Sequence, residues 1–278
     1  MSEGVVGTTV ITSDDGTPIG CHTAGRGPGL VVVHGSLRAA KHYRTLADTL
    51  AADFTVYTVD RRGRGVSGAQ GEGCGIDAEC ADLAAVLART GATMVFGHSY
   101  GGLVALETVL RRPDARIERL AVYEPAVSIG GAIRTDWLPE LERAVAEDRT
   151  SDGAAVLFGL GLAGELRHVP ARLRKVLLRA GLRGEMLADL RALLPTVPAE
   201  VRVARSLDSA GDRYAGVGTE TLLLAGDRSP AYLRQVTAVL AGTLPDATAA
   251  NVRNAGHNAP DLDAPGAVAE RLRAFFAA

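Results

Sequence analysis

The chain has 278 residues and a nearly balanced formal net charge of −2, with a sequence pI of about 6.3. Hydrophobic residues make up 47% and charged residues 22%, a mixture that excludes a disordered, collagen-like or coiled-coil chain. Without a basic excess we expect no nucleic-acid partner. We also expect no membrane association, because no apolar run reaches the ~18 residues that a membrane span needs.

The cysteines and the N-terminal residues indicate the cellular compartment of the protein. The three cysteines Cys21, Cys74 and Cys80 form no C-x-x-C pair, which argues against a disulfide framework and against a metal site. Residues 1–12 lack the basic start and apolar run of a secretory signal. The sequence therefore predicts a cytoplasmic protein.

The first half of the chain alternates short apolar runs with segments of helical spacing. Strands are expected at 8–12, 19–24, 30–33, 54–60, 93–96 and 119–123, and helices at 37–52, 77–89 and 103–111. Continuous apolar runs are typical of parallel strands that are buried on both faces. Strands that alternate with helices in this way predict a parallel α/β sheet.

The alternation of strands and helices stops between Pro125 and about Ala215. Helices are expected there at 138–147, 154–162, 171–179 and 185–194, with no convincing strand between them. The alternation then resumes with strands at 221–225 and 248–252 and helices at 231–243 and 265–277. We therefore predict one α/β core, residues 1–125 and 217–278, that carries a mostly helical insertion at 126–216.

The segment from Gly97 to Gly101 matches the motif G-x-S-x-G, with a strand before it and a helix after it. Glycines two positions to either side of Ser99 remove the side chains that would clash in a sharp strand-to-helix turn. Such a turn exposes the Ser99 hydroxyl at a helix N-terminus, where developing negative charge is favoured. The motif predicts a nucleophile; the alternative is a serine that only caps the helix.

Two further segments have the residue types that a nucleophilic serine requires. His34-Gly35-Ser36 ends an earlier strand, so the backbone N–H groups of Ser36 and Tyr100 are candidates for an oxyanion hole. His257, between the last strand and the last helix, is the candidate base that takes the serine proton. His34 is expected to pack beneath the site.

With these motifs the chain resembles α/β-hydrolase fold enzymes of the esterase, lipase and non-metal haloperoxidase kind. The likeness covers about residues 8–125 and 217–277 and rests on His34-Gly35, the loop 60–68 (DRRGRGVSG), the turn at Ser99 and Gly256-His257. It implies a mostly parallel central sheet flanked by helices, with residues 126–216 forming a cap over the substrate pocket. Because the sequence has no convincing metal-ligand cluster or phosphate-binding loop, we expect no metal and no organic cofactor.

The acid that would orient His257 departs from the commonest family pattern, a G-x-x-D turn. In the corresponding segment Ser229 holds the usual acid position and Asp227 lies two residues too early. Glu124 ends the strand after the helix that follows Ser99, a position from which some relatives take their acid. We favour Glu124 and keep Asp227 as the alternative.

Two other patterns allow competing interpretations. Residues 63–68 match G-x-G-x-x-G after a strand, but a dinucleotide site requires a helix to begin there, and a Gly-rich loop continues instead.

Within the insertion, Leu157, Phe158, Leu160 and Leu162 form an apolar face that either lines a pocket or packs in a core. The arginines between 167 and 183 are interpreted as a solvated helix face.

The sequence thus predicts a serine hydrolase that cleaves an ester, thioester or lactone of a small, partly apolar molecule through an acyl-enzyme on Ser99. A lyase, a cyclase or a C–C bond hydrolase that uses Ser99 and His257 as a base is the alternative. A non-catalytic ligand receptor on the same fold is a further one. The partner is expected to be a small molecule, and the protein a monomer or homodimer.

Overall fold

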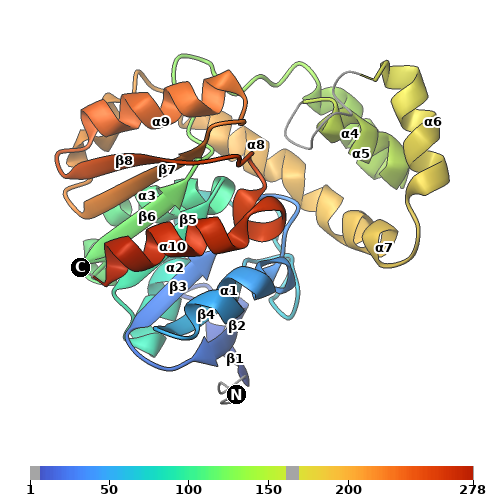
Figure 1. Cartoon of the computed structure of the whole chain (residues 1–278). Helices are drawn as coiled ribbons and strands as arrows, with labels where there is room; N and C mark the ends of the chain where they lie inside the picture. Colours follow the sequence, from blue (N-terminus) through green and yellow to red (C-terminus); the bar gives the residue numbers. More distant parts are fainter. Residues whose placement is uncertain (1–6, 161–168, 278) are drawn as a thin grey trace.

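The computed structural model describes residues 7–160 and 169–277 and contains an eight-stranded sheet in the order β1-β2-β4-β3-β5-β6-β7-β8 (Figure 1). The strands are β1 (Gly7–Thr12), β2 (Pro18–Gly25), β3 (Gly29–Val33), β4 (Thr55–Asp60), β5 (Met94–His98), β6 (Arg119–Tyr123), β7 (Glu220–Gly226) and β8 (Ala247–Val252). β2 pairs antiparallel with β1 and β4, and the other pairs are parallel. Each of these strands overlaps a strand that the sequence predicts.

Helices cover both faces of the sheet. They are α1 (Arg44–Leu50), α2 (Ile76–Thr90), α3 (Tyr100–Arg111), α9 (Ala231–Thr243) and α10 (Pro265–Phe276). Side chains alternate along each strand: in β3, Leu30 and Val32 pack in the cluster with α1 and α10, whereas Val31 and Val33 pack in the cluster with α2, α3 and α9. Both faces of the parallel strands are therefore buried.

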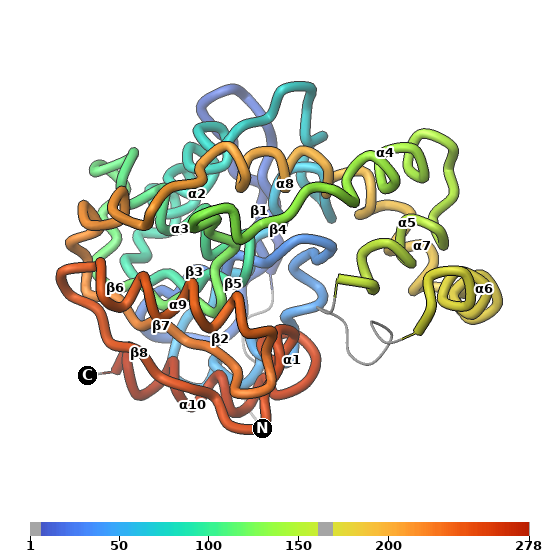
Figure 2. The backbone as a smooth tube through the Cα atoms, turned by 90° about the horizontal axis from the view of Figure 1, so that it is seen from above, coloured from blue at the N-terminus to red at the C-terminus, as the bar shows by residue number. Residues whose placement is uncertain are grey.

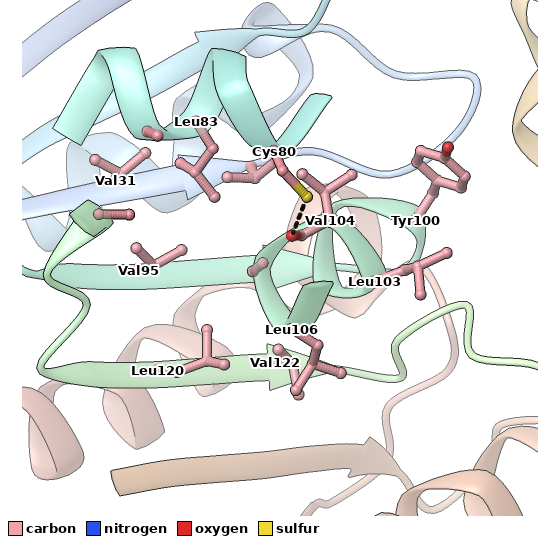
Figure 3. Packing of buried hydrophobic residues seen from close by; sticks show 14 of the residues in the cluster. Val31, Cys80, Leu83, Val95, Tyr100, Leu103, Val104, Leu106, Leu120 and Val122 are labelled. Carbon is pink, nitrogen blue, oxygen red and sulfur yellow. Dashed lines mark hydrogen bonds between the residues drawn. The ribbon is translucent and has the colours of Figure 1, made fainter. Parts of the chain in front are cut away.

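The core between β5 and α3 fixes the turn that carries Ser99. Val95 of β5, Leu103 and Val104 of α3 and Cys80 of α2 belong to one buried cluster, in which the Cys80 side chain points towards Val104 (Figure 3). The Cys80 thiol also contacts the Val104 carbonyl oxygen at 3.9 Å. Because strand and helix are each held in a buried layer, their junction has little freedom to move.

The helix predicted at 37–52 begins later than expected, and this part of the prediction is wrong. A 3₁₀ turn covers Ala40–Tyr43 and α1 begins only at Arg44. Leu37 has φ +56°, a left-handed conformation that an α-helix cannot include. The N–H of Ala40 donates instead to the Asp60 carboxylate at 2.8 Å, so residues 34–39 stay a loop.

The insertion between β6 and β7 is helical within its described residues. It contains α4 (Leu138–Ala146), α5 (Thr150–Phe158), α6 (Ala171–Gly181), α7 (Gly184–Leu193) and α8 (Val197–Ser206). Helices α4 to α7 extend beyond one end of the core, and α8 leads back to it (Figures 1 and 2). No helix in residues 7–160 and 169–277 is both long and apolar enough to cross a bilayer.

Two expectations for the insertion need correction. Helix α5 spans Thr150–Phe158 rather than 154–162, and Leu162 and Arg167 lie outside the described residues. Helix α8 was not predicted at all. Pro198 lies in its first turn, where the missing N–H removes no helical hydrogen bond, so the helix tolerates it.

Candidate active site

Ser99 occupies a strained turn between β5 and α3. Its backbone has φ 53° and ψ −119°, and its N–H donates to the Tyr123 carbonyl oxygen at 3.0 Å. A Cβ atom at Gly101 would lie 2.2 Å from the Val33 carbonyl oxygen, and one at Gly97 would lie 2.6 Å from the Gly101 oxygen. The turn thus requires glycine at both positions and leaves the Ser99 hydroxyl at the carboxyl end of the sheet.

We expect Gly101→Ala to lower the free energy of unfolding by about 1–3 kcal/mol or more, because the methyl group meets fixed backbone atoms. Gly242→Ala is the matched control: Gly242 lies in α9, no atom of residues 7–160 or 169–277 beyond the adjoining turns of this helix comes within 4 Å of the added methyl group, and alanine has the higher helix propensity. Denaturant unfolding of the two variants measures the difference. Equal midpoints would contradict the steric account of the turn.

The structure brings Ser99, His257 and Glu124 into one line of hydrogen bonds. The Nε2 atom of His257 lies 3.2 Å from the Ser99 Oγ, and its Nδ1 atom lies 2.7 Å from Glu124 Oε2. The other carboxylate oxygen of Glu124 accepts the Gly226 N–H at 2.8 Å. Since the ionised carboxylate can only accept, Nδ1 carries the proton, and Nε2 is free to accept one from Ser99.

The alternative acid, Asp227, has a different position. Its carboxylate accepts the backbone N–H of Ala255 at 3.2 Å and so supports the loop that carries His257. Glu124 reaches the imidazole because its residue has φ +43° directly after β6, and its N–H donates to the Leu224 carbonyl oxygen at 2.9 Å. Of the two carboxylates, the structure therefore places Glu124 against His257.

The loop after β3 lies directly against Ser99. A Cβ atom at Gly35 would be 3.0 Å from the Cβ of Ser99, so the loop could not approach so closely with a larger residue. Ser36 and Tyr100 line the same cavity as Ser99. Within the described ranges neither backbone N–H has a hydrogen-bond partner. Both are available to an oxygen atom near Ser99.

His98 connects three parts of the site. Its Nε2–H donates to the His257 carbonyl oxygen at 2.8 Å, and its Nδ1 accepts the Tyr43 hydroxyl. That hydroxyl in turn accepts the Gly35 N–H at 3.3 Å. Burial lowers the pKa of His98 well below its usual value, so the ring is neutral and provides the one donor and one acceptor used here. The arrangement fixes the loop that carries His257 relative to the loop after β3.

His34 packs beneath the site. Its Nδ1–H donates to the Gly35 carbonyl oxygen at 2.8 Å, and its Nε2 accepts the Arg61 N–H at 3.1 Å. Burial lowers the pKa of His34 well below its usual value, so this ring is also neutral. Both of its nitrogen atoms are engaged with the backbone, which suits a structural support for the loop.

A cavity of about 470 Å³ opens above Ser99 between the core and the insertion. Its apolar lining consists of Leu37, Ala126, Val127, Ala132, Ile133, Trp137, Leu157, Phe158, Leu160, Val197, Val201, Ala204 and Leu233. Three charged side chains, Arg38, Arg134 and Glu200, also line it. Three of the four residues of the apolar face predicted in the insertion therefore face this cavity, and the fourth, Leu162, is not described.

The loop 60–68 does not continue into a helix, since α2 begins only at Ile76. Asp60 accepts hydrogen bonds from Ala40 and from the Val66 N–H at 3.2 Å, and the loop folds around its carboxylate. A Cβ atom at Gly65 would lie 1.9 Å from Asp60 Oδ2, so glycine is required there by contact with the carboxylate. The G-x-G-x-x-G pattern is accounted for by this packing.

Arginines of the same loop form a buried charged cluster with two glutamates. Arg61 binds Glu79 of α2 with two hydrogen bonds of 2.6 and 2.9 Å and Glu200 of α8 at 2.5 Å, and Arg64 also binds Glu200. Burial alone lowers the pKa of Arg61, but the two carboxylates raise it above its usual value. The cluster attaches the insertion to the core.

We expect Arg61→Met to lower the free energy of unfolding by about 3–5 kcal/mol, because two buried carboxylates lose their shared partner. Arg116→Met is the control. Arg116 is exposed and forms a surface pair with Glu118 at 3.8 Å, so its loss should cost at most about 1 kcal/mol. Thermal and denaturant unfolding compare the two, and equal stability losses would contradict a structural role for the cluster.

Comparison with known proteins places the chain in a family. A family model described as "Alpha/beta hydrolase family" matches residues 30–271, and the chain belongs to that family. Among solved structures, an alpha/beta hydrolase from Sphaerobacter thermophilus DSM 20745 is 31% identical with a TM-score of 0.80, covering 96% of this chain and 100% of the other. The predicted fold class is confirmed, and the chain is a hydrolase.

Curated relatives are more distant in sequence. Proteins named pimeloyl-[acyl-carrier protein] methyl ester esterase from Xanthomonas campestris pv. campestris (strain B100) and Stenotrophomonas maltophilia (strain K279a) are each 29% identical to this chain. The matches cover 91% of this chain and 97% and 95% of the two relatives. An esterase from Rhodococcus sp. ECU1013 shares the fold with a TM-score of 0.74 at 22% identity, over 98% of both chains.

Three charged residues that line the cavity, Arg38, Arg134 and Glu200, were not predicted from the sequence. Arg38 binds the buried Asp261 and so connects the loop after β3 to the segment that follows His257. A helix around Glu200 was detectable from the apolar spacing of Val197, Val201 and Ala204. Nothing in the local sequence, however, indicates that this helix borders the cavity.

Proposed function

We propose that this hydrolase cleaves an ester, thioester or lactone of a small, partly apolar molecule through an acyl-enzyme on Ser99. The observation that carries the proposal is the line of hydrogen bonds from Glu124 through His257 to Ser99, at the floor of a largely apolar cavity. Serine needs such a base, because its hydroxyl is a weak nucleophile at neutral pH.

The reaction follows from the positions of the atoms. The Ser99 Oγ attacks the scissile carbonyl carbon while its proton moves to His257 Nε2. The carboxylate of Glu124 holds the Nδ1 proton and stabilises the resulting imidazolium. The N–H groups of Ser36 and Tyr100 bind the oxyanion of the tetrahedral intermediate. His257 then protonates the leaving alcohol or thiol, and a water molecule, activated by the same imidazole, releases the acid and restores the Ser99 hydroxyl.

The insertion, residues 126–216, is proposed to act as the cap that shapes the substrate pocket. Leu37 of the oxyanion loop packs against both apolar clusters of the insertion, and Trp137 and Phe158 line the cavity above Ser99. A cavity of about 470 Å³ with this lining suits a small apolar acyl or alcohol group. The relatives named as methyl ester esterases support an ester rather than an amide as the substrate.

Burst kinetics with p-nitrophenyl esters of graded acyl length test the proposal. We expect a rapid release of p-nitrophenol equal to the enzyme concentration, followed by slower turnover, because acylation precedes a slower hydrolysis of the acyl-enzyme. The dependence of kcat/KM on acyl chain length shows which length of acyl group the pocket accommodates. Ester turnover that persists unchanged in Ser99→Ala would contradict the covalent step.

A further inference from the structure

The cavity above Ser99 contains a carboxylate that the proposed reaction does not use. Glu200 lies in α8 with only 1% of its surface exposed, and it is the one acidic residue among the described residues that line the cavity. Its neighbours on the same helix, Val197, Val201 and Ala204, line the cavity with apolar groups. A buried carboxylate in such a lining needs an explanation, because its desolvation is costly.

The arginines of the loop after β4 account for one of its two oxygen atoms. Arg61 and Arg64 both donate to Oε1 of Glu200. Burial by itself would raise the pKa of Glu200, but the charges of Arg64 and Arg61 and the nearby Ser36 hydroxyl lower it below its usual value. Glu200 is therefore ionised at neutral pH and can only accept hydrogen bonds.

The second oxygen, Oε2, is buried and receives no hydrogen bond of regular geometry from residues 7–160 or 169–277. An unpaired buried acceptor is destabilising, and a charged one more so than a neutral one. The Ser36 hydroxyl is the neighbouring polar group, and the N–H of the same residue is the proposed oxyanion donor. Glu200 is thus close to the residue whose N–H would bind the scissile carbonyl oxygen.

We propose that Glu200, together with the Ser36 hydroxyl, forms a polar subsite that accepts a hydrogen bond from a hydroxyl or N–H group of the substrate. This rests on the proposed ester hydrolysis and narrows its substrate class. The preferred substrate carries a hydrogen-bond donor a few bonds from the scissile carbonyl and is otherwise apolar. The donor group pairs with Oε2 of Glu200, and an ester without such a group leaves that oxygen unpaired in the complex.

Matched esters isolate this contact. In the acyl series, p-nitrophenyl 2- and 3-hydroxybutanoate are compared with the corresponding methoxybutanoates; in the alcohol series, 2-hydroxyethyl butanoate is compared with 2-methoxyethyl butanoate. A methoxy group retains the oxygen atom but cannot donate. We expect the hydroxy ester to have a kcat/KM about 10- to 100-fold above its methoxy partner in at least one pair.

Two variants of Glu200 test whether this side chain is the reason that hydroxy esters react faster than methoxy esters. Glu200→Gln removes the charge, and Glu200→Asp keeps the charge but withdraws the carboxylate by one methylene group. Each should bring the hydroxy-to-methoxy ratio towards one. Because the ratio compares two substrates on one protein, a general loss of activity cancels, and Glu200→Asp provides the result if Glu200→Gln does not fold.

Glu142→Gln is the matched control, because Glu142 also binds a residue of α8, Arg202, without lining the cavity. Its ratio should equal that of the unmodified protein. A ratio near one for every pair in the unmodified protein, or a high ratio that survives both Glu200 variants, would overturn the subsite alone. Failure of every ester to turn over, with Ser99 unlabelled by a fluorophosphonate, would instead overturn the proposed function.

Discussion

Replacing Ser99 with alanine should lower kcat for an activated ester by about 10⁶-fold, since the variant has neither a nucleophile nor a route to the acyl-enzyme. The fold should survive. Alanine is smaller than serine, and the turn is held by the N–H of residue 99 and by the glycines at 97 and 101 rather than by the hydroxyl. The measurement compares steady-state and burst kinetics of the purified variant with those of the unmodified protein.

Ser206→Ala is the control for this experiment, because Ser206 is exposed at the end of α8 and its hydroxyl donates, among the described residues, only to the Val203 carbonyl oxygen at 2.8 Å. Its kinetics should match those of the unmodified protein. If Ser99→Ala kept more than about one hundredth of the original rate, another group would have to start the reaction, and the assignment of the nucleophile would be wrong.

Changing Glu124 to glutamine should lower kcat by about 10⁴-fold, the effect of the equivalent acid-to-amide change in a Ser-His-Asp enzyme. The reason lies in the 2.7 Å contact with His257 Nδ1. An amide that presents its NH₂ group there favours the tautomer with the proton on Nε2, and this tautomer cannot take the proton of Ser99. The pH dependence and kcat of the variant measure the effect.

Asp227→Asn is the comparison for Glu124→Gln. Its Oδ1 accepts the Ala255 N–H, and an amide oxygen can accept the same bond, so we expect a loss of less than about tenfold. A large loss in Asp227→Asn with near-native activity in Glu124→Gln would reverse the assignment. Near-native rates in both variants would mean that neither carboxylate orients His257.

The sequence was most informative where structure is determined locally. The turn at Ser99 was predicted from the run at Val95-Phe96, the glycines at 97 and 101 and the helix that follows. Each of these features is required by contacts within a few residues or with the adjacent strand. The same holds for the strands β3, β5, β6 and β7, whose apolar runs reflect burial on both faces of the sheet. Residue type and spacing carry this kind of information.

Features that depend on distant contacts were harder to predict. The boundary of α1 depends on Leu37 in a left-handed conformation and on the contact of Ala40 with Asp60, which is 20 residues away. The acid could be narrowed only to Glu124 or Asp227, because both follow strands that end at the same edge of the sheet. Glu200 reaches the cavity only through the packing of a helix that local sequence does not position.

Intact-mass analysis after treatment with a fluorophosphonate tests the central claim most directly, since the reagent modifies a serine that a neighbouring imidazole activates. We expect one adduct for each chain, located by peptide mapping on Ser99, absent in Ser99→Ala and strongly slowed in His257→Ala. An adduct on a different residue, or esters hydrolysed at full rate by a protein that remains unlabelled, would contradict the account.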